Sequence, residues 1–507
     1  MMNMMHDDEI LENDLSRMEG VELEYCGKLK CRSSRELPLS SRVSIGFECL
    51  DRELFDPEPC YGKLGRAGVK WARCQTGWNR CEKERGTYDF AWLDEIVDKL
   101  LAEGIQSWFN VGFGNPLYMK DTYSEAAVGC VPLYYGEETV RAWENYVSAL
   151  ARHFRGRVRF YEIWNEPNLP AFWQPRDPDP EEYARLVRLT GTRIREEDPS
   201  ARIGACVSGG NSWYTQHFLR SGIASFLDFF SIHPYSVQPE LNCAETAEAL
   251  RSTLDSCGAS HVELWQGECG FASWFPENHW LPPYVRESER NQAAWLLRRY
   301  VSDFAAGMSL SSFFQTADMM LKDYKVGNET RKQPARHGIL NGITYTEKLS
   351  FHAMRHIANV FSSRMPLRGG GAFCAVSLDR AFPRSERHSR LMDAAVFKAV
   401  FEKNSFPVFA YYLAEDVQYG FPGIGHVFLQ ASPGRGGVSS SSAVPGADSA
   451  PVIRNPVLLD LMTGKAYWVK HFQAGDPLFW LEFHSLPLTD YPLLISDLSA
   501  FELDGKA

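Results

Sequence analysis

The sequence of 507 residues contains no apolar run of about 18 residues or more, which excludes a membrane-spanning helix. It also lacks a stripe rich in Lys or Arg, and its formal net charge is −11, so nucleic acid is a poor candidate partner. The N-terminus is acidic and has no apolar segment of the kind found in secretory signals. We therefore expect a cytoplasmic protein; the oligomeric state is left open, a homo-oligomer included.

Paired cysteines and clustered metal ligands are missing as well. The 12 cysteines are scattered singly between Cys26 and Cys374, with no C-x-x-C pair. This spacing is typical of reduced thiols and not of a disulfide framework. Histidine and cysteine never occur together at the spacing of a zinc site. The sequence thus predicts neither a metal nor a cofactor.

What the chain does have is an ordinary globular composition that is rich in aromatic residues. Hydrophobic residues make up 44% and charged residues 23%, while aromatics reach 13% and include 14 Trp. Flat aromatic faces suit carbohydrate sites, but large buried cores use them too. The length exceeds that of a single core, so we expect one large domain and a smaller one.

Short apolar runs alternate with amphipathic helical patterns over the first two thirds of the chain. In the segment 92–101, for example, Trp92, Ile96 and Leu100 form one apolar stripe. Alternation of this kind predicts parallel strands with right-handed crossovers, and eight units fit a closed barrel better than an open sheet. No glycine-rich phosphate fingerprint follows the first run, which counts against a dinucleotide fold. The eight predicted strands are 43–47, 69–74, 106–111, 158–164, 202–207, 228–233, 262–266 and 310–315.

After a closing helix over 349–361, the helical periodicity stops and strand-like segments separated by turns follow. This pattern predicts a β-sandwich. The resulting fold class is α/β, a (β/α)₈ TIM barrel over 41–362 with a C-terminal β-sandwich accessory domain over 363–507. Residues 1–40 form an N-terminal segment whose strand, 21–31, we expect to join the sandwich, and the Gly/Ser-rich stretch 432–450 reads as a flexible loop. The predicted sandwich strands are 373–376, 394–401, 408–413, 426–429, 457–461, 466–469, 478–483 and 492–495.

In such a barrel the reactive groups lie where strands end and the βα loops begin. The fourth and seventh strands end at Glu166 and Glu268, on roughly opposite sides of the mouth. Retaining glycoside hydrolysis needs two carboxyl groups about 5–5.5 Å apart, one as nucleophile and one as acid/base. Strict alternation along regular strands would give a common face to Glu162, Trp164 and Glu166, and likewise to Leu264, Gln266 and Glu268.

A glutamate at a strand end is more often a surface or salt-bridge residue than a catalytic one. Glu162 and Glu263 illustrate the difficulty, because both lie near the candidates. We assign both a structural role, since Glu162 would sit lower in the barrel and Glu263 has the parity opposite to Glu268. Glu166 stands out because it is flanked by Asn165 and Pro167 at a mouth position.

The run Trp164-Asn-Glu-Pro167 resembles the acid/base signature of clan A glycoside hydrolases, and 43–361 is similar to their barrel. The segment 161–173 followed by a sandwich most resembles glycoside hydrolase family 39, which includes β-xylosidases and α-L-iduronidases. The resemblance implies a retaining mechanism with Glu166 as acid/base and Glu268 as nucleophile. The motif is specific for the clan and much less so for the family.

Further roles are implied by the same resemblance. Asn165 would hydrogen-bond the sugar 2-hydroxyl, and Arg73 would support the nucleophile and lower its pKa. His233 matches a residue that assists the acid/base, and Tyr235 one that hydrogen-bonds the nucleophile. A lone histidine here would more often be a satisfied core residue, but His233 and Tyr235 together beside two carboxylates suit pKa tuning.

One departure from the clan concerns strand eight, which commonly ends in a Trp beneath the sugar. Here the nearest match is Phe314, so the family's substrate preference does not carry over directly. Asn110 is a polar position at the mouth of strand three. Trp173 and Trp274 are candidate sugar platforms on loops, as are Trp78, Trp213 and Trp280, although packing is an equally good explanation for each.

These features predict a retaining glycoside hydrolase that cleaves a β-type bond, exo-acting on oligosaccharides or small glycosides. A transglycosidase would use the same residues with another acceptor. A non-catalytic sugar-binding barrel is disfavoured by the presence of both carboxylates and Arg73. A metal-dependent barrel hydrolase would need His ligands on strand one, which 43–50 lacks.

Overall fold

The computed structural model describes residues 10–120, 122–274, 288–363, 365–366, 373–381, 396–414, 423–430, 453–475 and 480–505. Eight parallel strands, β2 to β9, close into a barrel in chain order, which confirms the predicted fold class. The ends of all eight lie within three residues of the predicted runs. The barrel strands are β2 (Val43–Gly46), β3 (Trp71–Gln75), β4 (Gln106–Val111), β5 (Phe160–Ile163), β6 (Arg202–Ser208), β7 (Phe229–His233), β8 (Glu263–Cys269) and β9 (Leu310–Phe313).

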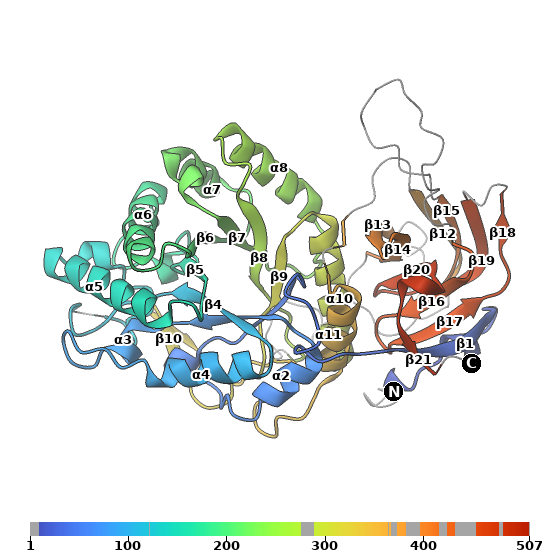
Figure 1. The fold of residues 1–507 in the computed structure, drawn as a ribbon, viewed down its shortest axis with the longest axis horizontal. Coiled ribbons are helices and arrows are strands. Elements are labelled where there is room, and N and C mark those ends of the chain that lie inside the picture. The colour runs from blue at the N-terminus through green and yellow to red at the C-terminus, as the bar shows by residue number, and fades with distance from the viewer. Residues whose placement is uncertain are drawn as a thin grey trace.

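Helices surround the barrel on its outside (Figure 1). The sequence specifies their ends locally: in α6, for example, Asp179 accepts hydrogen bonds from the first-turn amides of Glu181 and Glu182, and Pro180 occupies the first turn. The α-helices are α2 (Tyr61–Ala67), α3 (Trp78–Cys81), α4 (Ala91–Ala102), α5 (Glu137–Phe154), α6 (Pro180–Glu197), α7 (Trp213–Phe218), α8 (Cys243–Ser256), α10 (Glu289–Ala305) and α11 (Leu349–Val360). Shorter 3₁₀ and π turns are η1 (Leu15–Arg17), η2 (Leu50–Arg52), η3 (Pro132–Tyr134), η4 (Pro170–Phe172), η5 (Leu219–Ile223), η6 (Ala224–Phe226) and η7 (Leu498–Ala500).

Beside the barrel lies an antiparallel β domain of two sheets (Figure 1). The larger sheet has the order β13-β14-β20-β16-β17-β1-β21, and the smaller has the order β12-β15-β19-β18. The strand β1 (Leu23–Leu29) pairs with β17 and β21, so the N-terminal segment does lie in this domain, drawn in blue among red strands. Its other strands are β12 (Phe373–Ala381), β13 (Val396–Lys403), β14 (Phe406–Leu413), β15 (Gly423–Gln430), β16 (Pro456–Asp460), β17 (Lys465–Val469), β18 (Gln473–Ala474), β19 (Trp480–Leu488), β20 (Leu493–Asp497) and β21 (Leu503–Asp504).

Buried polar contacts fasten the β domain to the barrel helices. Arg290 on α10 forms an ion pair with Asp490, and both side chains are almost fully buried. The ring of His356 on α11 lies 2.9 Å from the carbonyl oxygen of Leu461, in the turn between β16 and β17. These contacts link the last two barrel helices to the sheet that contains β1.

Three further expectations concern the flexible stretch, the cysteines and membrane-spanning helices. The stretch 432–450 lies outside the described residues. All twelve cysteines are free thiols, and ten of them are buried. Across the parts of the chain that the structure describes, no helix combines the length and the apolar character needed to cross a membrane.

Candidate active site

Arg73, at the centre of β3, is the hub of a polar cluster at the carboxyl ends of the barrel strands. Its side chain is fully buried and binds three carboxyl groups. Nη1 lies 2.7 Å from Oε2 of Glu48 and 2.5 Å from Oε2 of Glu268. Nε lies 3.0 Å from Oε1 of Glu162, and Nη2 donates to Glu162 and to the side-chain oxygen of Asn165. One guanidinium thus organises side chains from β2, β5 and β8.

Glu268 reaches this cluster through a β-bulge. Trp265 packs inside the barrel against Trp108, whereas Gln266 faces outward and binds Ser311 beside α10. On a regular strand Glu268 would follow Gln266 outward, so the common face predicted for these two residues is wrong. The register between β8 and β9 shifts between Gln266 and Cys269, and the additional residue turns Glu268 to the mouth.

A comparable break in alternation occurs where β5 ends. Trp164 and Glu166 both have positive φ, 66° and 44°, which is uncommon for non-glycine residues. As a result Trp164 leaves the interior and packs against Trp143 of α5, with ring centroids 6.1 Å apart. Asn165 and Glu166 therefore both face the cluster around Arg73, although they are neighbours in the chain.

The end of β7 joins the two candidate carboxylates. Nδ1 of His233 lies 3.2 Å from Oε1 of Glu166 and 3.9 Å from Oε2 of Glu268. The ligand atoms of these three residues all lie within 4.8 Å of one another. The hydroxyl of Tyr235 donates a hydrogen bond of 2.9 Å to Oε1 of Glu268. The site thus holds two carboxylates at close range, each with its own partners.

The carboxyl groups of Glu48 and Glu268 both bind Arg73, but their pKa values are shifted in opposite directions. Burial alone would raise the pKa of Glu268, but His233, Arg73 and the Tyr235 hydroxyl outweigh it and hold the pKa below its ordinary value. Burial raises the pKa of Glu48 well above its ordinary value, and the charge of Arg73 only partly offsets this. The sequence interpretation missed Glu48. A signal was present, because alternation along β2 directs Ser44, then Gly46, then position 48 into the barrel.

Glu162 and Asn110 support the site from below. Both are fully buried, and Nδ2 of Asn110 lies 2.9 Å from Oε1 of Glu162. The same amide donates to the carbonyl oxygen of Trp164. Asn110 therefore does not face the mouth as a substrate contact, as the sequence had suggested; it holds Glu162 and the end of β5 in position.

The tryptophans predicted as sugar platforms differ in how far they are exposed. Trp173 is fully buried, packs edge-on against Trp164 and donates to the Tyr134 hydroxyl, so the prediction that it binds sugar is wrong. Trp78 is equally buried. Trp274 is partly exposed with the guanidinium of Arg336 over its ring, and it stays a candidate. Trp213 is exposed on α7, and Trp280 lies outside the described residues.

Phe314 follows β9 at the rim of the barrel. It is partly exposed and packs with a small apolar group that includes Cys49, Leu54 and Met319. The ring of His337 lies 5.7 Å from that of Phe314. The residue that replaces the expected Trp is thus positioned beside the β2 end of the site, next to the loop that carries Glu48.

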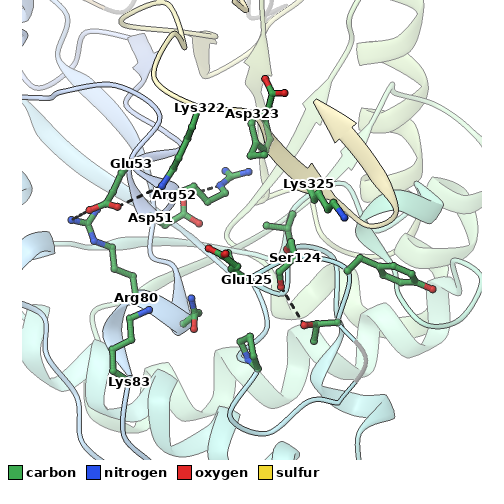
Figure 2. Close-up of a pocket in the computed structure, with 17 residues that line it drawn as sticks. Asp51, Arg52, Glu53, Arg80, Lys83, Ser124, Glu125, Lys322, Asp323 and Lys325 are labelled. Carbon is green, nitrogen blue, oxygen red and sulfur yellow. Dashed lines mark hydrogen bonds and ion pairs between the residues drawn. The ribbon is translucent and has the colours of Figure 1, made fainter. Parts of the chain in front are cut away.

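A cavity of about 1090 Å³ opens at the same side of the barrel (Figure 2). Charged side chains from the loops after β2, β3, β4 and β9 line it, and Figure 2 shows Glu53 between Arg80 and Lys322. Glu166 and Glu268 are not part of its lining. Arg52 connects the two regions, because its Nη2 lies 3.3 Å from Sγ of Cys49, the residue next to Glu48.

Three groups of described residues place potential metal ligands together, which spacing along the chain did not predict. Two of them share His233 at the centre of the barrel, one with Glu166 and Glu268. The members of these two groups come from different barrel strands and are therefore far apart in the sequence. The guanidinium group of Arg73 already provides a positive charge beside Glu268. The groups are Glu162/Cys206/His233, Glu166/His233/Glu268 and, in the β domain, His426/Glu482/His484.

Part of the chain matches the model of a known protein family. Residues 71–259 match Glycosyl hydrolases family 39. A β-xylosidase of Geobacillus stearothermophilus is 29% identical over 166 residues, which cover 29% of this chain and 31% of that protein. The matched segments thus span about a third of the length of the curated relatives.

Two solved structures share the fold over most of the chain. A family 39 glycoside hydrolase from the gut symbiont Bacteroides cellulosilyticus WH2 has a TM-score of 0.59 at 16% identity, covering 92% of this chain and 82% of the other. A GH39 β-xylosidase from Caulobacter crescentus has a TM-score of 0.50 at 17% identity, covering 92% and 97%. The match over residues 71–259 includes Arg73, Glu166 and His233, and the resemblance to this family that the motifs predicted is confirmed.

Proposed function

We propose that this protein is a retaining glycoside hydrolase, with Glu268 as nucleophile and Glu166 as acid/base. The observation that carries the proposal is the short separation of the two side chains, because one carboxylate oxygen of Glu166 lies within 4.8 Å of one carboxylate oxygen of Glu268. Retaining enzymes hold their carboxyls about 5–5.5 Å apart, whereas inverting enzymes need about 6.5–9.5 Å to admit a water molecule. The geometry therefore supports double displacement.

In the first step a carboxylate oxygen of Glu268 attacks the anomeric carbon while Glu166 transfers its proton to the departing glycosidic oxygen. The bond from the anomeric carbon to the leaving group breaks as the ester to Glu268 forms. In the second step Glu166, now a carboxylate, takes a proton from water, and the resulting attack releases Glu268. The sugar keeps its anomeric configuration because it is inverted twice.

The surroundings of each group suit its role. Arg73 and Tyr235 favour the ionised form of Glu268, in agreement with its lowered pKa, so the nucleophile is charged in neutral solution. His233 contacts Glu166 and is within 3.9 Å of Glu268, where it can stabilise the acid/base as its charge changes. Asn165 is held by Arg73 at the position from which it would bind the 2-hydroxyl.

For substrate, the proposal is a β-linked glycoside cleaved from its non-reducing end. Two of the matched relatives carry the name β-xylosidase, and a xyloside is therefore the first compound to test. The charged cavity would hold the part of the substrate remote from the cleaved bond. A panel of aryl xyloside, galactoside, glucoside, arabinoside and glucuronide identifies the sugar; release of internal fragments only from a polymer would contradict exo-action.

Variants at the two carboxylates test the mechanism. Glu268→Gly should abolish hydrolysis of an aryl glycoside, and added azide should restore turnover because it fills the space and attacks in place of the carboxylate. Glu166→Ala should slow substrates with poor leaving groups by about 10²–10⁴-fold and activated aryl glycosides far less. Full activity of either variant would refute the assignment.

The matched control is the substitution Glu263→Gly. Glu263 lies on the same strand as Glu268, and in the described structure its carboxylate accepts a hydrogen bond only from Trp265. The variant should retain activity. The ratio of transfer to hydrolysis at low concentrations of an alcohol acceptor separates the two functions, since a transglycosidase forms mainly transfer products and a hydrolase mainly the free sugar.

A further inference from the structure

Glu48 belongs to the Arg73 cluster but has no role in the two steps of the proposed mechanism. Its side chain is 1% exposed, and it follows β2 on the face that points into the barrel. A Cβ on Gly46 would lie only 2.8 Å from Oε1 of Glu48, so the glycine makes room for this carboxyl. The barrel interior therefore has room for this carboxyl, and Glu48 is not an incidental surface residue.

The carboxyl groups of Glu48 and Glu268 also meet directly. Oε2 of each binds the same Nη1 of Arg73, and the two side chains are within hydrogen-bonding reach of one another. Two ionised carboxylates in contact repel, and burial makes that repulsion costly. A proton on one of the two converts the repulsion into a short hydrogen bond between acid and carboxylate.

The distribution of donors indicates which carboxyl carries that proton. Oε1 of Glu162 accepts from Nε and Nη2 of Arg73 and from Asn110, and Glu268 accepts from Arg73 and Tyr235. Glu48 accepts from Arg73 alone, and within the described structure its Oε1 has no donor. One guanidinium with three carboxyls leaves an excess of negative charge, and Glu48 is the least compensated of them.

We propose that Glu48 is a positioning residue that stays protonated and donates a hydrogen bond to the carboxylate of Glu268. This inference rests on the proposed function, because it acts through the nucleophile. The donated bond holds Glu268 in one orientation and stabilises its charge when it departs from the sugar in the second step. The raised pKa of Glu48 and the lowered pKa of Glu268 agree with this division of protons.

Two substitutions test the proposal through the acidic limb of the kcat/KM profile, which reports ionisation of the nucleophile. Glu48→Gln keeps a neutral donor, so the limb should stay within about 0.3 pH unit of wild type. Glu48→Leu removes the donor, so the limb should move to higher pH by about one unit and kcat/KM should fall about 10- to 100-fold. An ionised Glu48 requires the opposite sign, because removing a like charge lowers the pKa of Glu268 and shifts both variants to lower pH.

Other ionisable groups around Glu48 stay unchanged in both variants, so the comparison isolates one proton. They are Arg73 on β3, Glu162 on β5, Tyr235 after β7, Glu268 on β8 and the thiols of Cys49 and Cys74. A shift of both limbs to lower pH would overturn the proposal.

A second measurement needs neither turnover nor a substrate. The infrared difference spectrum of wild type minus Glu48→Gln at neutral pH should contain the carbonyl band of one protonated carboxylic acid, and its absence would overturn the proposal. Thermal unfolding of both variants checks that they fold. If the infrared band is present while the enzyme cleaves no glycoside, the proposed function has failed and the assignment of the proton has not.

Discussion

Tyr235 and Arg73 approach Glu268 from opposite sides, one through Oε1 and the other through Oε2. Both oxygens of Glu268, the proposed nucleophile, are thus held by donors in the absence of substrate. Such preorganisation costs no rearrangement during the reaction and favours the ionised carboxylate. Tyr235 is the neutral member of the pair, so its loss changes one hydrogen bond and leaves the net charge of the site unchanged.

Tyr235→Phe should therefore raise the pKa of Glu268 and move the acidic limb of the kcat/KM profile to higher pH by less than one unit. The expected loss in kcat/KM is about 10-fold, the size of one hydrogen bond to a charged group. Steady-state kinetics between pH 4 and 8 provide the measurement. Tyr214→Phe removes a hydroxyl that, among the described residues, hydrogen-bonds only to the backbone carbonyl of Asp179, and it should leave the profile unchanged. A limb that does not move in Tyr235→Phe would contradict the assigned contact.

At this scale the sequence predicted Glu268 from its position at a strand end and most other site residues from a motif, and it missed Glu48. Glu166 and Asn165 follow from Trp-Asn-Glu-Pro, and Arg73, His233 and Tyr235 from the resemblance that the motif revealed. Glu48 has no motif around it, and its importance comes from Arg73 and Glu268, which lie on other strands. Trp173 was misjudged because the burial of a loop aromatic depends on neighbours such as Tyr134 and Trp164.

At the scale of the elements, β8 contains a glycine in a crowded position at its bulge. A Cβ on Gly267 would lie 2.0 Å from Oγ of Ser231 and 3.1 Å from Oε2 of Glu162. Glycine at the bulge thus allows β8 to approach β7 closely enough for Glu268 to reach Arg73. The bulge escaped prediction because its cause lies in Ser231 and Glu162, and not in the sequence of β8 itself.

Gly267→Ala should lower stability by about 1–3 kcal/mol and lower kcat by more than 10-fold, because β8 must move away from Ser231. Combining it with Ser231→Ala removes the closest atom and should recover most of both losses. Chemical denaturation and aryl glycoside kinetics measure the two effects. The control Gly62→Ala lies in α2 with no atom near the added carbon and should be neutral or slightly stabilising. Equal defects in the single and double variants would show that the crowding at Ser231 is not the cause.

Over the whole molecule, the barrel could be predicted closely because eight strand and helix units leave a strong periodic pattern. The β domain was predicted as well, including its N-terminal strand. The packing between the domains was not, since contacts such as Arg290 with Asp490 join residues that are distant in sequence. The cavity also escaped, because four loops from separate units build it.

His356 makes this interface sensitive to acid. Its Nδ1 donates to the carbonyl oxygen of Leu461, and burial lowers its pKa from 6.5 to about 3. Between these values the unfolded chain binds a proton that the folded chain does not, so stability falls as the pH drops below 6.5, by about 1.4 kcal/mol per unit. Above that range the histidine is neutral in both states and contributes no pH dependence.

His356→Asn should keep a donor towards Leu461 and remove the titration. The loss of unfolding free energy between pH 7 and pH 5 should then be about 2 kcal/mol smaller than in the wild type. Denaturant unfolding at the two pH values measures it. His217→Asn, an exposed position on α7, should leave the loss as it is; an unchanged loss in His356→Asn would mean that other groups cause the acid sensitivity.

The cavity in Figure 2 is made almost entirely by loops, while the groups around Arg73 come from strand ends. Exposed residues such as Lys83, Glu125 and Lys325 can be exchanged without altering the barrel core. Arg52 is the exception, since it is buried and reaches Gln75 on β3. Under the proposed function, the molecule therefore separates the recognition of a substrate from its cleavage, and new specificities can be selected at the rim while the chemistry below is inherited unchanged.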